Sequence, residues 1–271
     1  MNELSWMLSE KDFLFLIQVL MPGCKDRQRM VKILREDEDI LRGMLLDKKL
    51  LDYLTDEQES LIKVSPHLFF TVLLERVKAD LEHQSYTIER DQRIQMVVFD
   101  SKNVIYLLNE KKIIRYLTDM LVSFIRINNV TIPIRVKKGV WSKIRFSDFD
   151  VDSLIKYSHM IDENQRFGPY KRIADICLFI TGIFPEYIEA QRTYSGVSRA
   201  RLGAISQWSR EGIEKYGKYF YKAAAQQKAA QLQELDTVLM NLSENFILAT
   251  KPLSFMTRRY LGFSKDKFFL R

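Results

Sequence analysis

Between residues 173 and 184 the chain is almost entirely apolar. The apolar residues are Ile173, Ala174, Ile176, Cys177, Leu178, Phe179, Ile180, Ile183 and Phe184. The Gly168-Pro169 pair before them is typical of a helix start. A helix that is apolar on every face must be surrounded by other elements. The sequence therefore predicts a helix at the centre of a packed core.

Residues that form turns are scarce, since 271 residues include only 10 Gly and 6 Pro. This scarcity favours long regular segments, which are usually helices. Helix starts are also marked locally, by Ser9 with Asp12 three residues later and by Ser65 before Pro66. We therefore expect a mainly α fold, a compact multi-helix bundle with a long C-terminal helical arm.

Residues 85–146 interrupt the helical pattern and predict a small β-hairpin excursion. Residues 86–88 and 96–99 are rich in β-prone types and favour one hairpin. Residues 130–136 and 140–146 flank a Lys-Lys-Gly turn and favour a second pair of strands. Pro133 within the first of these strands indicates an edge position, because proline cannot donate to a ladder.

The chain length fits one large domain or two small ones. We expect a single helical domain over residues 1–250. A boundary between two subdomains near residue 100 or near residue 190 is the alternative. A basic and aromatic tail over residues 251–271 follows it. The tail contains Lys251, Arg258, Arg259, Lys265, Lys267 and Arg271 together with Phe255, Tyr260, Phe263, Phe268 and Phe269, and its one acidic residue is Asp266.

Charge is distributed unevenly along the chain. Residues 1–100 carry 14 Lys and Arg against 19 Asp and Glu, whereas residues 101–271 carry 28 against 16. Segregated charge creates a field that steers an anionic partner toward the basic part. The alternative is that the basic tail docks on the acidic N-terminal part of the same chain. The opposite charges would then neutralise each other, and little separation of charge would remain on the molecule.

Residues 192–222 interleave cations with aromatic rings. The cations are Arg192, Arg199, Arg201, Arg210, Lys215, Lys218 and Lys222, and the rings are Trp208, Tyr216, Tyr219, Phe220 and Tyr221. Cations neutralise phosphates and rings stack on unpaired bases, so this stretch is a candidate nucleic-acid surface. The alternative places the rings in the core and the cations in water. No zinc knuckle, RNP-type strand or GXXG loop indicates a named nucleic-acid module.

Arg172 and Asp175 stand three residues apart at the start of the apolar helix, so they can pair on one helix face. Such a pair either closes the core or belongs to a site. No nucleophile–base arrangement, paired carboxylates or phosphate-binding glycine loop accompanies it, so we lean against an enzyme. His67, His83 and His159 show no metal-ligand spacing, and we expect no metal or other cofactor.

Cys24 and Cys177 make no disulfide framework, which favours a reducing cytoplasm. The apolar residues 13–21 are too short to span a bilayer, and their flank is acidic where a secretion signal is basic. We therefore expect a buried first helix and no transmembrane segment.

A leucine stripe near the C-terminus alternates spacings of three and four residues, as in a coiled coil. It consists of Leu232, Leu235, Leu239, Leu242, Phe246 and Ala249. Fewer than three heptads is short for a freestanding coiled coil, which favours packing inside the bundle over a homodimer.

Together these patterns predict a non-enzymatic cytoplasmic binding or adaptor protein. Its basic C-terminal half would recognise an acidic protein or another anionic partner. The alternative is binding of DNA or RNA through residues 192–222 and the tail. An enzyme with a site near residues 166–175 is the third hypothesis.

Overall fold

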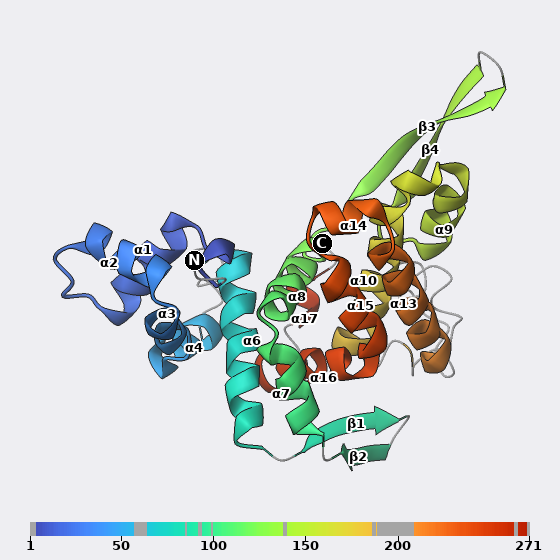
Figure 1. The fold of residues 1–271 in the computed structure, drawn as a ribbon. Coiled ribbons are helices and arrows are strands. Elements are labelled where there is room, and N and C mark those ends of the chain that lie inside the picture. Colours follow the sequence, from blue (N-terminus) through green and yellow to red (C-terminus); the bar gives the residue numbers. More distant parts are fainter. Residues whose placement is uncertain are drawn as a thin grey trace. The chain divides into compact units, whose positions relative to one another are not determined.

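The structure is a computed structural model that describes residues 4–56, 64–84, 86–91, 94–98, 100–137, 140–185, 188, 209–262 and 265–269. The described part is mainly helical with two antiparallel hairpins, which confirms the predicted fold class (Figure 1). It divides into two compact units. Unit 1 is Met1–Ser123 with Lys251–Lys265, and unit 2 is Phe124–Thr250 with Asp266–Arg271. Two such units are compatible with one domain or two, so the single domain over residues 1–250 stays a prediction.

Unit 1 is built from short helices and one hairpin. Its elements are η1 (Ser5–Met7), α1 (Glu10–Leu20), α2 (Arg27–Glu36), α3 (Glu38–Leu45), α4 (Lys48–Asp56), α6 (Pro66–Glu82), β1 (Thr87–Asp91), β2 (Ile94–Val98), α7 (Ser101–Asn109), α8 (Lys111–Ser123), the last turns of α16 (Phe246–Met256) and the π-helical turn η4 (Thr257–Leu261). Helix α6 contacts α3, α7 and α8 and buries Phe70, Leu73 and Val77 completely or nearly so. It is therefore the central helix of this unit.

Local capping sets the helix starts in unit 1 as predicted. The Ser9 hydroxyl accepts a hydrogen bond from the Asp12 backbone N–H, and the Asp12 carboxylate accepts one from the Ser9 N–H at 2.8 Å. The Ser65 hydroxyl likewise accepts from Leu68 N at 3.1 Å, with Pro66 at the first helical position. These bonds satisfy N–H groups that a helix start leaves without partners.

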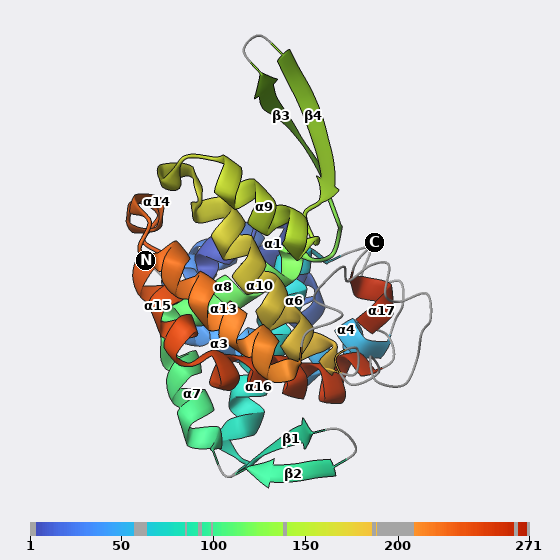
Figure 2. The ribbon, with the colours of Figure 1, turned by 90° about the vertical axis from the view of Figure 1, so that its right-hand side faces the viewer.

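Unit 2 contains the second hairpin and a layered set of helices. Its elements are β3 (Asn129–Lys137), β4 (Val140–Ser147), α9 (Val151–Met160), η2 (Glu163–Gln165), α10 (Phe167–Ile183), α13 (Arg210–Ala225), α14 (Lys228–Leu232), α15 (Asp236–Glu244), the first turns of α16 (Phe246–Met256) and most of α17 (Lys265–Phe268). Helix α10 packs against α9 and α13, and α13 packs against α15 (Figure 2).

The predicted central helix is α10, whose residues from Ile173 to Ile183 are all buried. At its inner side Phe179 stacks on Phe124 with ring centroids 4.2 Å apart, and it meets Phe149 edge-on at 6.3 Å. Phe269 lies edge-on to Phe179 at 5.0 Å. The aromatic rings therefore tie both ends of this unit's sequence to α10.

Both predicted hairpins are present. Strands β1 and β2 pair from Thr87↔Val98 to Asp91↔Ile94. Strands β3 and β4 pair from Asn129↔Ser147 up to a bulge after Arg135. The β3–β4 strands extend beyond α9 in both views of the molecule (Figures 1 and 2).

The leucine stripe is divided by helix ends and does not follow one helix. Helix α14 ends at Leu232, which is 77% exposed, and Leu235 is the N-cap residue of α15. Leu239, Leu242 and Phe246 are fully buried in the same chain. Packing inside the bundle is therefore confirmed for these three residues, and the homodimer stays a prediction.

Within the described residues, no helix combines the length and the apolar character needed to cross a bilayer.

Candidate functional site

A buried polar network joins α10 to α13. The Lys171 ammonium lies 2.7 Å from Asp175 Oδ2, and the Tyr221 hydroxyl donates a hydrogen bond to Asp175 Oδ1 at 2.9 Å. Asp175 is 1% exposed. A buried carboxylate is tolerated only when it is paired and hydrogen-bonded, and here both of its oxygens have partners. The network therefore holds the two helices together.

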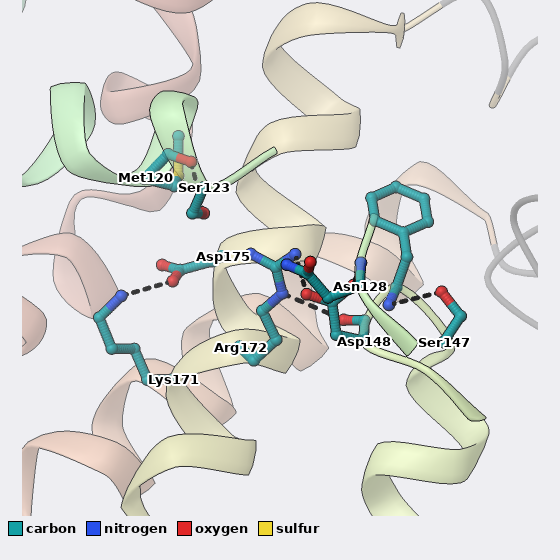
Figure 3. A network of polar contacts seen from close by, with 9 residues as sticks. Met120, Ser123, Asn128, Ser147, Asp148, Lys171, Arg172 and Asp175 are labelled. Carbon is teal, nitrogen blue, oxygen red and sulfur yellow. Dashed lines mark hydrogen bonds and ion pairs between the residues drawn. The ribbon is translucent and has the colours of Figure 1, made fainter. Parts of the chain in front are cut away.

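Arg172, the residue after Lys171, joins α10 to the base of the β3–β4 hairpin (Figure 3). Its Nε donates to the Asp148 carbonyl at 3.0 Å, and its Nη2 donates to Asp148 Oδ2 at 3.0 Å. The guanidinium also lies 4.0 Å from the ring centroid of Phe124. Burial lowers the pKa of Arg172, and the charges of Asp148 and Asp175 raise it in part.

Asp148 also closes the hairpin itself. Asn128 N donates to Asp148 Oδ1 at 3.0 Å, and Asp148 N donates to the Asn128 carbonyl at 2.9 Å (Figure 3). The residues just outside the two strands are thus bonded to each other and, through Asp148, to Arg172. This arrangement fixes the base of the hairpin on α10.

Arg172 and Asp175, which the sequence predicts as a pair, each also bond to residues outside that pair. Arg172 bonds to Asp148, 24 residues earlier, and Asp175 bonds to Lys171 and to Tyr221, 46 residues later. Asp175 still lies close enough to act on the charge of Arg172. These contacts support the structural interpretation, in which the charges close the core.

The outer face of α13 carries a different kind of surface. Ser209 caps this helix by accepting from Gly212 N at 3.1 Å. The inner face buries Ile213, Gly217, Phe220, Tyr221, Ala224 and Ala225. Exposed side chains include Lys215, Tyr216, Tyr219 and Lys222, which we call the α13 surface. Because residues three and four apart are neighbours on a helix, these four side chains form one patch.

Both tyrosines of the α13 surface rest on a buried ring. Tyr219 meets Phe220 edge-on at 5.1 Å, and Tyr216 stacks on it at 6.1 Å. Tyr170 of α10 contacts the same ring at 5.4 Å. Nevertheless Tyr219 is 63% exposed and Tyr216 is 41% exposed. Contact with Phe220 therefore positions both tyrosine rings, while a large part of each ring remains exposed to solvent.

The structure separates the basic residues predicted over residues 192–222. Lys215 and Lys222 are exposed on α13, whereas Lys218 pairs with Glu214 at 2.6 Å and Arg210 is half-buried at the helix start. The other three predicted cations, Arg192, Arg199 and Arg201, lie outside the described residues, as does Trp208. The aromatic residues divide as well, since Phe220 and Tyr221 are buried and the other two tyrosines are exposed.

The basic tail docks on acidic residues of unit 1, which confirms the alternative of internal docking for two of its cations. Lys251 forms an ion pair with Asp100, and both side chains are largely buried. Arg259 Nε lies 2.9 Å from Asp80 Oδ2, and the hydroxyl of Tyr260 bonds to the same carboxylate. Part of the basic excess in the C-terminal half is therefore neutralised inside unit 1.

The structure describes the other cations of the tail only in part. Arg258 is exposed on η4, and Lys265 is half-buried at the start of α17. The side chains of Lys267 and Arg271 lie outside what the structure describes. Their predicted binding role stays a prediction.

The ion pair of Lys251 has a testable consequence for stability. Replacing Lys251 with methionine should destabilise the protein by about 2 kcal/mol, because the Asp100 carboxylate loses a cation in a largely buried place. Urea unfolding measures this loss. The matched change Arg259→Met removes a pair whose arginine is 60% exposed, and it should cost well under ~1 kcal/mol. Equal losses in the two variants would contradict this interpretation of the tail.

The sequence patterns did not predict one basic segment as a candidate site. The β3–β4 hairpin contains no acidic residue between positions 129 and 147, while its cations are Arg135, Lys137, Lys138, Lys143 and Arg145. The excess is visible in the sequence, but the predicted binding residues were cations beside clusters of aromatic residues, in residues 192–222 and in the tail. A count of charge within each predicted strand pair would have found it.

In the part of the chain that the structure describes, no three His, Cys, Asp or Glu residues are grouped so that they could hold a metal ion. Comparisons with protein-family models, with curated proteins and with solved structures found no match. The functional argument therefore rests on the geometry of the chain itself.

Proposed function

We propose that the protein is a cytoplasmic, non-enzymatic binding or adaptor protein that recognises an acidic protein partner through the α13 surface. The observation that carries this proposal is the pair of exposed tyrosines between Lys215 and Lys222. Tyrosine offers a large contact area with a polar tip and is enriched at interfaces. The lysines supply the charge that attracts an anionic partner.

The opposite side of α13 supports a binding role because it is firmly packed. Tyr221 and Ala224 are fully buried, and the Tyr221 hydroxyl is bonded to Asp175. A helix held in this way has a fixed backbone, so its outer side chains project from fixed positions. Presentation from a rigid element reduces the entropy lost on binding.

The reactive side chains of this region favour binding over catalysis. Asp175 has both oxygens engaged by Lys171 and Tyr221. The Cys177 thiol is fully buried, and burial raises its pKa far above the ordinary value, so it is a poor nucleophile. Cys177 and Cys24 are both free thiols, which fits the reducing cytoplasm that we propose as the location.

A nucleic acid is the second candidate partner, and the exposure of Tyr216 and Tyr219 favours it. Exposed rings beside cations can stack on unpaired bases. Salt distinguishes the two partners. Phosphate contacts release counterions, so affinity for an oligonucleotide should fall steeply as ionic strength rises.

The proposal predicts a specific loss of binding. The double change Lys215→Glu and Lys222→Glu should weaken binding of a labelled glutamate-rich peptide by at least ~10-fold, since two attractive charges become repulsive. Fluorescence anisotropy at low and at physiological salt measures this affinity, with a labelled single-stranded oligonucleotide as the second probe. The matched control is Lys156→Glu with Lys228→Glu, two exposed lysines elsewhere in unit 2.

The control must bind the peptide as well as the unchanged protein does. Equal weakening in both double variants would show attraction by net charge alone and would reject the α13 surface. Stronger binding of the oligonucleotide, reduced by about 10-fold in Tyr219→Ala, would replace the acidic protein with a nucleic acid as the partner.

A further inference from the structure

The β3–β4 hairpin is a two-stranded ribbon. Strand β3 has nine residues and β4 has eight, and among the described strands each pairs only with the other. The strands extend beyond α9 in both views (Figures 1 and 2). Because an isolated two-stranded hairpin is at best marginally stable in water, a ribbon of this length needs more than its own pairing.

Strand register gives the ribbon one basic face. Thr131 lies opposite Arg145, and Pro133 lies opposite Lys143. Directly opposite residues share a face, and faces alternate with every residue along a strand. These four positions and the next pair, Arg135 opposite Trp141, therefore lie on the same face, where Thr131, Lys143 and Arg145 are exposed.

The alternate register positions are apolar except for Ser142, which lies opposite Ile134. Val130 lies opposite Phe146, and Ile132 lies opposite Ile144. At the base of the ribbon this face packs on the same unit, since Phe146 is buried and its ring centroid lies 6.0 Å from that of Tyr157 in α9. Ile132 and Ile144 are the next pair of this register, farther along the ribbon.

The base of the ribbon is held rigidly, so the two faces have a fixed direction on unit 2. Asp148 bonds to Asn128 across the base and to Arg172 on α10. The ribbon is therefore a preformed element whose exposed basic positions can contact a partner.

We propose that the β3–β4 hairpin binds an anionic lipid surface. The apolar positions would enter the boundary between headgroups and acyl chains, and the basic positions would lie among the anionic headgroups. This inference goes beyond the proposed function, because it uses a surface other than α13.

The cations of the ribbon and its alternation of basic and apolar positions together favour an anionic lipid surface over other binding partners. A nucleic acid would neutralise the cations but would make no use of the apolar positions. A second copy of the chain would cover the apolar positions but would bring a second set of the same cations. An anionic lipid surface satisfies both faces at once.

Co-sedimentation with vesicles tests the proposal. The full-length protein should bind phosphatidylcholine vesicles that contain phosphatidylserine and should bind pure phosphatidylcholine vesicles much less. Lys143→Gln with Arg145→Gln should weaken binding by about 25-fold, since each cation near an anionic surface contributes about fivefold. Ile132→Ser with Ile144→Ser should weaken it by a similar factor at unchanged charge. Circular dichroism checks that both variants keep their helices.

Lys156→Gln with Lys228→Gln is the matched control and should bind these vesicles normally. Lys215→Glu with Lys222→Glu should also bind them, so the lipid proposal and the α13 surface can fail separately. If the variant with Lys143→Gln and Arg145→Gln bound vesicles as well as the unchanged protein does, the lipid proposal would be overturned. Binding of duplex DNA in place of vesicles would do so as well, and so would a lipid-free dimer that the Ile132/Ile144 variant dissociates.

Discussion

Replacing Arg172 with methionine is expected to destabilise the protein by about 3 kcal/mol. The change removes two hydrogen bonds to Asp148 and the contact of the guanidinium with the Phe124 ring. It also leaves the Asp148 carboxylate, whose side chain is only 17% exposed, without this cation. Removing one member of a buried ion pair costs more than the pair contributes, because the other charge remains desolvated.

Urea unfolding followed by circular dichroism measures this loss, and a double-mutant cycle with Asp148→Asn isolates the pairwise part. We expect the double variant to be less destabilised than the sum of the single variants, since removing both charges leaves no buried ion unpaired. Lys156→Met, at an exposed position of α9, is the control and should change stability by less than ~0.5 kcal/mol. A loss below ~1 kcal/mol for Arg172→Met would mean that the hairpin base is not anchored on α10 as described.

Replacing Gly217 with alanine is expected to destabilise the protein by about 3 kcal/mol. In an open helix the same change would stabilise by up to about 1 kcal/mol, because alanine has the higher helix propensity. Here a Cβ atom would overlap the ring of Phe246 and lie 3.1 Å from Cβ of Cys177. Both neighbours are fully buried, so neither has room to move away.

Gly43→Ala is the matched control, because Gly43 lies in α3 and its added Cβ would meet nothing within 4 Å. It should leave stability unchanged or raise it slightly, by up to about 1 kcal/mol. Thermal unfolding of both variants compares them under the same conditions. Phe246→Leu should recover part of the loss in Gly217→Ala, since the smaller side chain vacates the overlapping volume. Equal stability of the two alanine variants would show that α13 does not approach α16 as closely as described.

Local chemistry explains why the fold class and several helix starts could be predicted from the sequence. The Ser9 and Ser65 caps act within three residues, so their patterns are complete in the local sequence. The burial of α10 follows from its composition alone. The two hairpins likewise follow from β-prone segments around short turns.

Partners distant in the sequence explain what could not be predicted. Spacing along α10 indicated Asp175 as the partner of Arg172, but Asp148 reaches it only once the hairpin has closed. The ion pairs of the tail could not be predicted for the same reason. Lys251 and Arg259 pair with acids more than 150 residues earlier in the chain, and no local pattern indicates which acids they meet.

The exposed side chains of α13 are a further feature that could not be predicted from the sequence. The sequence showed lysines and aromatic residues together, but not which rings face the core. Helical spacing around the buried Phe220 and Tyr221 settles this, because it turns Tyr216 and Tyr219 outward beside the lysines. Knowing the start of the helix at Ser209 would have been sufficient to assign these faces.

The most direct test of the account is acetylation footprinting of the unchanged protein, with and without a saturating glutamate-rich peptide. Mass spectrometry reports the reactivity of each lysine. The account predicts that the peptide protects Lys215 and Lys222 and leaves the exposed Lys156 and Lys228 as reactive as before. Protection of all four lysines alike, or of none at α13 while the peptide is bound, would contradict the claim that α13 presents the binding surface.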